Sequence, residues 1–231
     1  MNLSQLKASR LLWLRRERYR RAKWHFYRYS SKRNAADRLR LRRKWWSLYV
    51  AARSQRLARE RQISAATPKP SVRQQAVKYA LSFEGQTERP AGSNTGPGVI
   101  SRCQIDILGA DGYAWCGCFD GFILRWAGVK GVTSRIASVE FIEQDAKNKQ
   151  GPFSGWSQNA RGALPGDLVV LFGRGVHVGI IVKVYPDGSV DTIEGNTSSD
   201  DGGSQANGGG VFPRHRLSSA IHGVAHVDYP G

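Results

Sequence analysis

The chain has 231 residues, enough for one mid-sized domain with an appendage or for two small domains. Its 35 Lys and Arg face 18 Asp and Glu, which gives a formal net charge of +17. It has no run of about 20 apolar residues, which excludes a transmembrane helix. The apolar segment Leu11–Leu14 is too short for the core of a secretory signal, so we expect synthesis in a reducing cytoplasm. Three cysteines, Cys103, Cys116 and Cys118, are too few for a disulfide framework.

The positive charge is confined to one end. Residues 1–66 contain 20 basic and 3 acidic residues, whereas residues 67–231 contain 15 of each. A strongly cationic segment is therefore joined to an electroneutral one, and the two need separate explanations.

Residues 1–63 are predicted to be helical. Gly and Pro are absent before Pro68, and good helix formers dominate. A break is expected at 29–31, with Asn34 capping the second helix and Asp37 at its N3 position. The pattern predicts a helical hairpin or two helices in line. Residues 64–70 are predicted to be a linker, since neither Pro68 nor Pro70 extends a helix.

The role of this basic segment stays open. Four of the seven tryptophans lie among its arginines: Trp13, Trp24, Trp45 and Trp46. Anionic polymers, a membrane surface and nucleic acid are all partners that such a composition attracts. The alternative is a solvated helical pair with a charged outer face.

Residues 71–231 are predicted to form an α+β domain. Ser71 is a suitable N-cap for a helix that ends at Gly85, and a second, buried helix begins near Trp115 or Cys116. Strands follow, with a tight turn at 186–189 and a polar loop at 195–210. Helices first and antiparallel strands later favour α+β over a parallel βαβ sheet. The predicted strands are 167–172, 176–185 and 190–194, with one or two more within 211–229.

Two residues are candidates for thiol catalysis. Such chemistry needs a thiolate, a histidine that takes and returns its proton, and a polar group that orients the histidine. Cys116 lies where a loop is expected to enter a helix, and a helix N-terminus lowers a thiol pKa. His177 opens an otherwise aliphatic strand, where a polar ring needs a partner, and Gly179 leaves space beside it.

The orienting group is left undecided between Glu194 and Asn196. A two-residue turn at Asp187 and Gly188 would set residue 177 opposite residue 198, so that 194 and 196 share its face. Asn196 would then lie roughly 7 Å and Glu194 roughly 13 Å along the strand. A bulge or a longer turn would favour Glu194.

Several alternative sites are weak. Cys116 and Cys118 could hold a metal, but one C-x-C pair is a poor indicator, and no metal or other cofactor is expected. Calcium is conceivable at Asp106, Asp111 and Asp120, although solvated carboxylates are the simpler interpretation. Cys103 and Cys118 are expected to be structural. His215, His222 and His226 follow no ligand spacing and are expected to be surface or hydrogen-bonded residues.

Six ordered blocks lie within about residues 71–231, at 85–94, 112–119, 165–169, 177–182, 192–197 and 208–216. Together they resemble the CHAP family, the cysteine, histidine-dependent amidohydrolases and peptidases, which are papain-like relatives of the NlpC-type peptidases. By position, the resemblance implies Cys116 as nucleophile, His177 as base and Glu194 as the third polar group, with Asn196 as an additional or alternative helper. Family members often carry Ala-Ala after the cysteine, where this chain has Gly117 and Cys118.

The family cleaves peptidoglycan amide bonds, and the arrangement of blocks is similar to that of phage endolysins and related wall hydrolases of Gram-positive hosts. The resemblance therefore implies bacterial peptidoglycan as substrate, reached after release through a holin or from a virion. It also makes attachment to anionic wall polymers such as teichoic acids, or to the envelope, the favoured interpretation of the basic segment. Trp115, Tyr113 and Asn94 are candidate substrate-binding residues, although Trp115 could equally be a core aromatic. The alternative function is a non-catalytic virion, wall-binding or nucleic-acid-binding protein that retains the fold, because fold alone never proves activity.

Overall fold

The computed structural model describes residues 2–29, 34–67, 69–200 and 202–230. The chain divides into two compact units, Met1–Lys69 and Pro70–Gly231. Within the described ranges, no helix is both long and apolar enough to cross a membrane.

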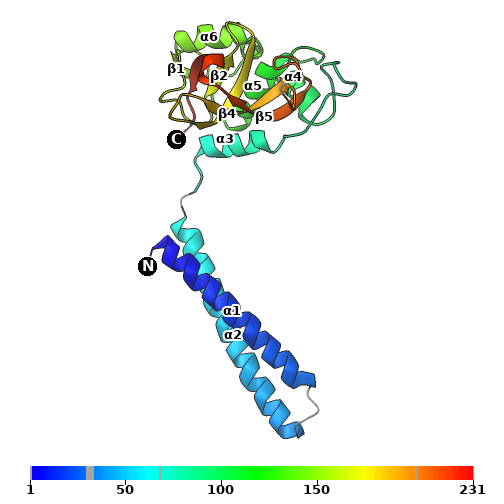
Figure 1. Ribbon diagram of the computed structural model, residues 1–231, viewed down its shortest axis with the longest axis vertical. Helices are drawn as coiled ribbons and strands as arrows, with labels where there is room; N and C mark the ends of the chain where they lie inside the picture. Colours follow the sequence, from blue (N-terminus) through cyan, green and yellow to red (C-terminus); the bar gives the residue numbers. More distant parts are fainter. Residues whose placement is uncertain (1, 30–33, 68, 201, 231) are drawn as a thin grey trace. The chain divides into compact units, whose positions relative to one another are not determined.

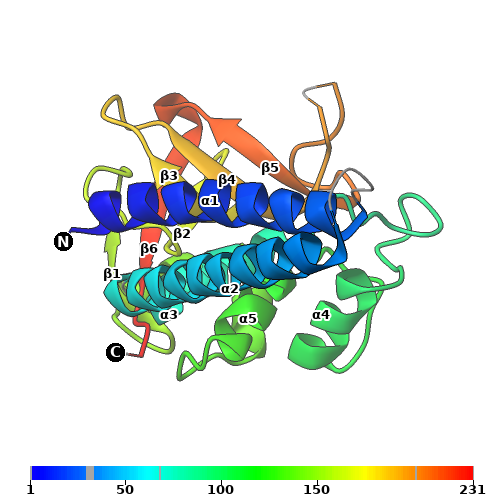
Figure 2. The ribbon, with the colours of Figure 1, turned by 90° about the horizontal axis from the view of Figure 1, so that it is seen from below.

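The first unit is a helical hairpin (Figures 1 and 2). Helix α1 spans Leu3–Tyr29 and helix α2 spans Ala35–Ala66. The Asn34 side chain accepts a hydrogen bond from the Asp37 backbone N–H over 2.8 Å, which confirms the predicted cap. The two helices pack along their length, so they form a hairpin rather than an in-line pair. Ser30 and Ser31, in the predicted break, lie outside the described residues.

Helix α2 runs three residues beyond the predicted end at position 63. Thr67 ends it with extended backbone angles, φ −87° and ψ 119°. The residue before a proline is pushed out of the helical region, and Pro68 follows Thr67 in the sequence. The helix therefore continues through Ala66, because nothing before Pro68 stops it.

The C-terminal unit begins with helices. Ser71 and Gln74 form a capping box at the start of α3, Val72–Leu81, which ends four residues before the predicted Gly85. The predicted buried helix is α5, Cys116–Trp126. Two further helices were not predicted: α4, Val99–Leu108, and α6, Val139–Lys147. Short 3-10 helices cover Ser134–Ala137 (η1) and Ser218–Ala220 (η2).

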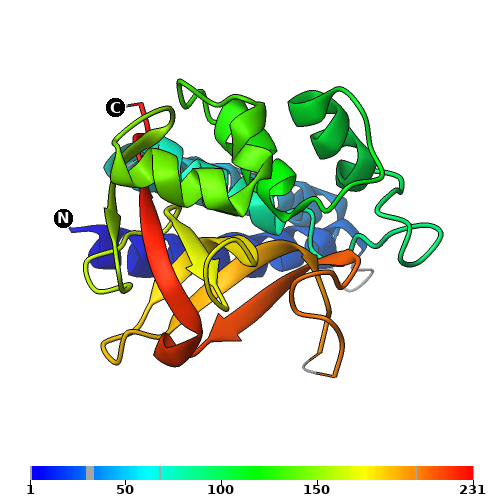
Figure 3. The ribbon, with the colours of Figure 1, turned by 90° about the horizontal axis from the view of Figure 1, so that it is seen from above.

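Six strands form one antiparallel sheet in the order β1-β6-β2-β3-β4-β5. Helices and sheet lie in separate layers, which confirms the α+β class (Figure 3). The strands are β1 Phe153–Ser157, β2 Leu168–Leu171, β3 His177–Val184, β4 Val190–Thr197, β5 Gly210–Arg216 and β6 Ile221–Val227.

Helix α5 is the centre of the main core. Its buried side chains Phe119 and Ile123 belong to the same apolar cluster as Val178, Ile180 and Ile193 of β3 and β4. Each such side chain contributes about 1.5–3 kcal/mol when it is fully buried. This packing fixes the N-terminus of α5 against β3 and β4, the two adjacent strands that carry the predicted polar residues.

Candidate active site

Cys116 is the first residue of α5. Trp115 occupies the N-cap position and provides no side-chain cap, so the first backbone N–H groups of the helix are left for other acceptors. Only 5% of the Cys116 surface is exposed. At Gly117, a Cβ would lie 2.2 Å from the Ile136 carbonyl oxygen, so the close approach of η1 explains glycine after this cysteine.

Trp115 is fully buried, and its Nε1 donates a hydrogen bond to Glu88 over 2.8 Å. Its prediction as a substrate-binding residue is therefore wrong. The ring is a core aromatic that packs edge-on against Phe119 and holds the start of α5 in place.

His177 and Glu194 are partners on adjacent strands. Both are fully buried, and His177 Nε2 lies 3.0 Å from Glu194 Oε2. Gly179 makes the contact possible, because a Cβ there would lie 2.5 Å from Glu194 Cγ. The space expected beside His177 is therefore occupied by the Glu194 side chain.

A bulge selects Glu194 over Asn196 as this partner. Near the turn, Val184 pairs with Val190 and Lys183 with Asp191, and the register then shifts so that Ile181 pairs with Thr192. The predicted register, with 177 opposite 198, is wrong. One residue is bulged out of β3, and the turn is longer than two residues. The shift brings Glu194 back along the strand to His177.

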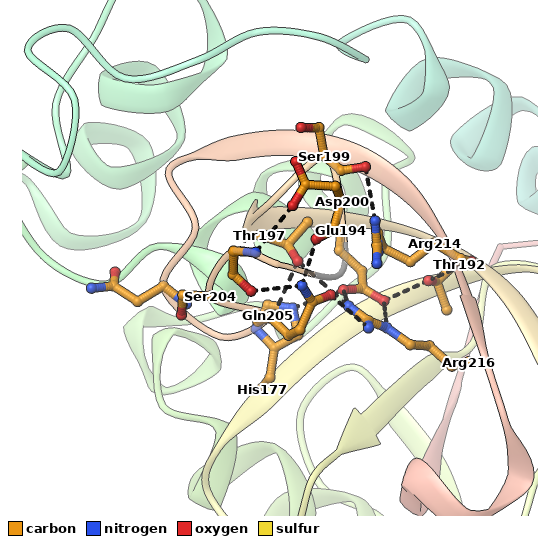
Figure 4. A network of polar contacts seen from close by, with 12 residues as sticks. His177, Thr192, Glu194, Thr197, Ser199, Asp200, Ser204, Gln205, Arg214 and Arg216 are labelled. Carbon is orange, nitrogen blue, oxygen red and sulfur yellow. Dashed lines mark hydrogen bonds and ion pairs between the residues drawn. The ribbon is translucent and has the colours of Figure 1, made fainter.

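Glu194 is also held from its far side (Figure 4). Arg216 Nε donates to Oε1 over 2.8 Å, and Arg216 Nη2 donates to Oε2. Thr192 donates its hydroxyl to Oε1, from the same face of β4. Neither Arg216 nor Thr192 is predicted as a site residue from the sequence. Thr192 could have been found from the two-residue period of the strand.

These contacts set three linked pKa values. Burial opposes the charge of Glu194, but hydrogen bonds from Arg216 and His177 outweigh it and lower its pKa to about 2. Burial also opposes the charge of His177, yet Cys116 and Glu194 raise its pKa to about 9. For Cys116, burial is again the largest effect, and the interaction with His177 overcomes it and lowers the thiol pKa. The arrangement favours a thiolate beside an imidazolium.

The imidazole uses its two nitrogens differently. Nε2 contacts Glu194, whereas Nδ1 has no hydrogen-bond partner of standard geometry among the described residues. Nδ1 is thus the nitrogen left to exchange a proton with Cys116.

Only one of the three thiols has this environment. Burial raises the pKa of Cys118 to about 12, and burial also raises the pKa of Cys103. All three cysteines are free thiols. The chemistry therefore points to Cys116 rather than to Cys118.

Asn196 is fully buried and adopts a left-handed conformation with φ 59°. Its amide oxygen and nitrogen have no hydrogen-bond partner among the described residues. If the β3–β4 register continues past its last pair, Ile180 with Ile193, residue 196 falls opposite His177. The structure gives the imidazole a hydrogen bond to Glu194 and none to Asn196, so Asn196 is not the orienting group.

Tyr113 and Asn94 lie on two loops joined by one buried amide. Gln104 donates to the Asn94 carbonyl over 2.7 Å and accepts from the Tyr113 backbone N–H over 2.9 Å. Asn94 is partly buried in a left-handed conformation, and 56% of the Tyr113 surface is exposed. The role of Gln104 in joining these loops is not predicted from the sequence.

A groove of about 560 Å³ is lined in part by the residues that directly precede Trp115 and Cys116 in the sequence. Tyr113 and Ala114 form one part of it, and Phe141 of α6 and Arg135 of η1 form another. The Arg135 guanidinium lies 4.0 Å from the centre of the Phe141 ring and pairs with Asp145. The groove is mostly apolar, with a polar rim, as ligand sites usually are.

The other predicted sites differ from this one. Among the described residues, no group of three or more His, Cys, Asp or Glu is arranged to hold a metal ion. Asp106 instead pairs with Arg125, and Asp120 is fully buried in α5. The remaining histidines of the C-terminal unit are hydrogen-bonded, as predicted: His215 with Asp191, His222 with Glu143 and His226 with Asp167.

Comparison with known families agrees with this geometry. Residues 109–196, which include Cys116, His177 and Glu194, match the family model of the CHAP domain. This match places a CHAP domain at residues 109–196. Among solved structures, the wild-type endolysin LysIME-EF1 is similar at 13% identity and a TM-score of 0.38, over 69% of this chain and 65% of that one. The chain thus spans less than two thirds of that protein's length, and no curated protein matches it.

Proposed function

We propose that the protein is a peptidoglycan hydrolase that cleaves an amide bond of bacterial wall peptides with Cys116 as nucleophile. The observation that carries the proposal is the buried series of Cys116, His177 and Glu194, in which only this thiol has a lowered pKa. The CHAP match supports the reaction class.

In the proposed reaction, the Cys116 thiolate attacks the carbonyl carbon of the scissile amide. The oxyanion accepts hydrogen bonds from uncapped backbone N–H groups at the start of α5. The His177 imidazolium then donates its proton to the leaving amine, and the C–N bond breaks. This leaves a thioester on Cys116 and a neutral imidazole.

Hydrolysis of the thioester completes the cycle. His177 removes a proton from water, the resulting hydroxide attacks the thioester, and the acid product leaves while the thiolate–imidazolium pair is restored. Glu194, held ionised by Arg216, stabilises the imidazolium and keeps Nδ1 directed toward Cys116. Asn196 adds an amide beside the imidazole, and no metal ion or cofactor takes part in these steps.

The apolar groove beside Tyr113 and Phe141 is the proposed binding site for the substrate peptide. The exposed Tyr113 ring gives an aliphatic stem peptide an aromatic surface to lie on. We propose that the enzyme reaches the wall after holin-dependent release from the host cytoplasm or from a virion.

The test is mass spectrometry of fragments released from purified walls of a susceptible bacterium. The wild type should release peptides with new amine termini, and Cys116→Ala should abolish release while circular dichroism is unchanged. Cys118→Ala is the matched control and should retain release. Equal release by Cys116→Ala would overturn the proposal, and release lost only in Cys118→Ala would move the chemistry to the other thiol. The fragment masses also decide between muramoyl–alanine amidase and endopeptidase activity.

A further inference from the structure

The helical hairpin contains a groove that the proposed chemistry does not use. It has a volume of about 480 Å³ and lies between one face of α1 and one face of α2. Its residues follow helical spacing on both helices, which makes it continuous along the pair. We call it the basic groove; it is lined by Glu17, Arg21, Trp24 and His25 of α1 and by Trp46, Tyr49, Arg53 and Arg56 of α2.

One end of the basic groove is aromatic. The ring centres of Trp24 and Trp46 are 5.2 Å apart, and those of Trp46 and Tyr49 are 5.3 Å apart. Nearly half of the Trp46 surface, 48%, is exposed. Ring faces of this kind pack well against the apolar faces of sugars and polyols.

The other end is cationic. Arg56 is held by Glu17 over 2.6 Å and by Glu60 over 2.8 Å, so its charge is already compensated. Arg21 and Arg53 are exposed, and neither makes a hydrogen bond or ion pair with another described residue. Two uncompensated guanidinium groups beside an aromatic cluster suit a ligand with repeated phosphate groups, since guanidinium binds phosphate through two parallel hydrogen bonds.

Few side chains of the hairpin are fully buried. Among the described hairpin residues, only Leu6 and Ala52 have buried side chains. Residues 1–66 nevertheless carry the whole net charge of +17. Concentrating so much like charge on two packed helices opposes folding through self-repulsion, and a bound polyanion would relieve that repulsion.

We propose that the basic groove binds a phosphodiester-linked anionic polymer of the bacterial wall and so holds the CHAP domain at its substrate. The choice of a wall polymer rests on the proposed function, because residues 67–70 tie the groove to a unit that acts on the wall. Phosphates bind at Arg21 and Arg53, and the linking sugar or polyol lies on the rings of Trp24 and Trp46.

Two other occupants fit the groove less well. The aromatic planes are tilted by 45° and 39°, and the rings contact one another, so they do not form a row of separate faces on which successive bases could stack. A membrane surface calls for a helix with apolar and basic residues on opposite faces. In both α1 and α2 these residue types are instead mixed around the helix.

The experiment measures binding of the full chain to purified walls. All proteins carry Cys116→Ala so that the walls stay intact. The probe is Arg21→Gln with Arg53→Gln, and the matched control is Arg40→Gln with Arg43→Gln, two exposed α2 arginines outside the groove. Both double variants lose two positive charges, so diffuse attraction to the wall falls equally. The groove variant should bind about tenfold more weakly than the control.

Ligand identity is tested with the same proteins on other surfaces. Walls stripped of phosphodiester polymers by hydrofluoric acid should lose the difference between the two double variants. Duplex DNA and vesicles of phosphatidylglycerol and phosphatidylcholine should show no such difference.

Equal wall binding by the two double variants would overturn the proposal that the basic groove binds the wall polymer. So would a difference that persists on stripped walls, or one that appears on DNA or vesicles instead. Fragment release by the variants with Cys116 intact is scored separately. Loss of groove-dependent binding with release intact refutes only the groove, and groove-dependent binding without release refutes only the hydrolase.

Discussion

Arg216 and Glu194 form a buried two-pronged ion pair, with Nε donating to Oε1 over 2.8 Å and Nη2 donating to Oε2. Arg216 is 5% exposed and Glu194 is fully buried. The same carboxylate contacts His177, and Arg216 itself makes no contact with the imidazole that the structure records. Arg216 thus acts on the proposed chemistry only through Glu194, as a positioning residue.

Removing that support should impair both folding and hydrolysis. Arg216→Gln leaves the Glu194 carboxylate buried without its cation, which should cost about 3–5 kcal/mol in the free energy of unfolding. Arg216→Lys keeps the charge but loses the second prong, so its loss should be smaller. Denaturant unfolding and fragment release measure the two effects. Arg174→Gln, which removes a surface ion pair with Glu140, is the control and should be nearly neutral. If Arg216→Gln matches it, the pair is not the support proposed.

The pH profile of Cys116 reactivity should show the His177 titration. The pKa of His177 is raised to about 9, so its imidazolium persists below that pH. As the pH rises above about 9, the imidazolium loses its proton and the thiolate–imidazolium pair is lost. Fragment release should therefore fall on an alkaline limb near pH 9. Any stability from the charged His177 is fully present below its unfolded pKa of about 6.5 and is lost over the same rise.

Glu194→Gln should move that limb to lower pH. The neutral amide no longer favours the imidazolium, so the pKa of His177 should fall, and the pKa of Cys116 should rise as the pair weakens. Fragment release measured between pH 5 and pH 10 follows the limb, and iodoacetamide labelling of Cys116, read by peptide mass spectrometry, follows the thiol pKa. A limb that stays in place in Glu194→Gln would show that the carboxylate does not act on the imidazole.

Gly179→Ala should disrupt the His177–Glu194 contact without touching either residue. The added Cβ would lie 2.5 Å from Glu194 Cγ, so the carboxylate must move, at a cost of about 1–3 kcal/mol. Gly155→Ala in β1 is the matched control, because its Cβ would meet its nearest neighbour at an ordinary 3.9 Å. Fragment release should fall well below that of the control. Equal release by the two variants would mean that the site tolerates the shift.

The sequence predicts the elements whose patterns are local. The caps at Asn34 and Ser71 follow from side chains within a few residues, and the start of α5 follows from the apolar run that begins there. Helices α4 and α6 are short, and tertiary packing of their apolar residues stabilises them more than local helix propensity does. Strand β1 is held mainly by pairing with β6, some 70 residues further along the chain, so no local pattern identifies it.

The site shows the same division. Cys116 and His177 are conspicuous as a thiol before a buried helix and a ring in an aliphatic strand. The choice between Glu194 and Asn196 depends on one bulged residue in β3, and a slip of one residue exchanges the faces of a strand. Arg216 reaches Glu194 from a third strand, and pairing across strands is a tertiary property that one sequence does not determine.

Asp120 is a buried acid whose titration should make the stability of the protein depend on pH. It lies one helical turn after Cys116, is fully buried, and neither carboxylate oxygen has a hydrogen-bond partner among the described residues. Burial, and then the nearby thiolate of Cys116, raise its pKa well above the usual value. The folded protein therefore holds a neutral acid that the unfolded chain ionises. The stability that the folded protein gains from holding this acid neutral is fully present below the ordinary Asp pKa of about 3.9. It is lost as the pH rises toward the raised pKa of Asp120.

Asp120→Asn keeps the shape of the side chain and removes this titration. The variant should be more stable than the wild type at pH 8 by about 1–3 kcal/mol and should lose that advantage toward pH 4. Calorimetric unfolding of the full chain at several pH values measures the difference. Asp106→Asn, an exposed partner of Arg125, should change stability by no more than about 0.5 kcal/mol at either pH. A pH-independent difference between Asp120→Asn and the wild type would mean that Asp120 is charged in the folded protein, with a compensating group beside it.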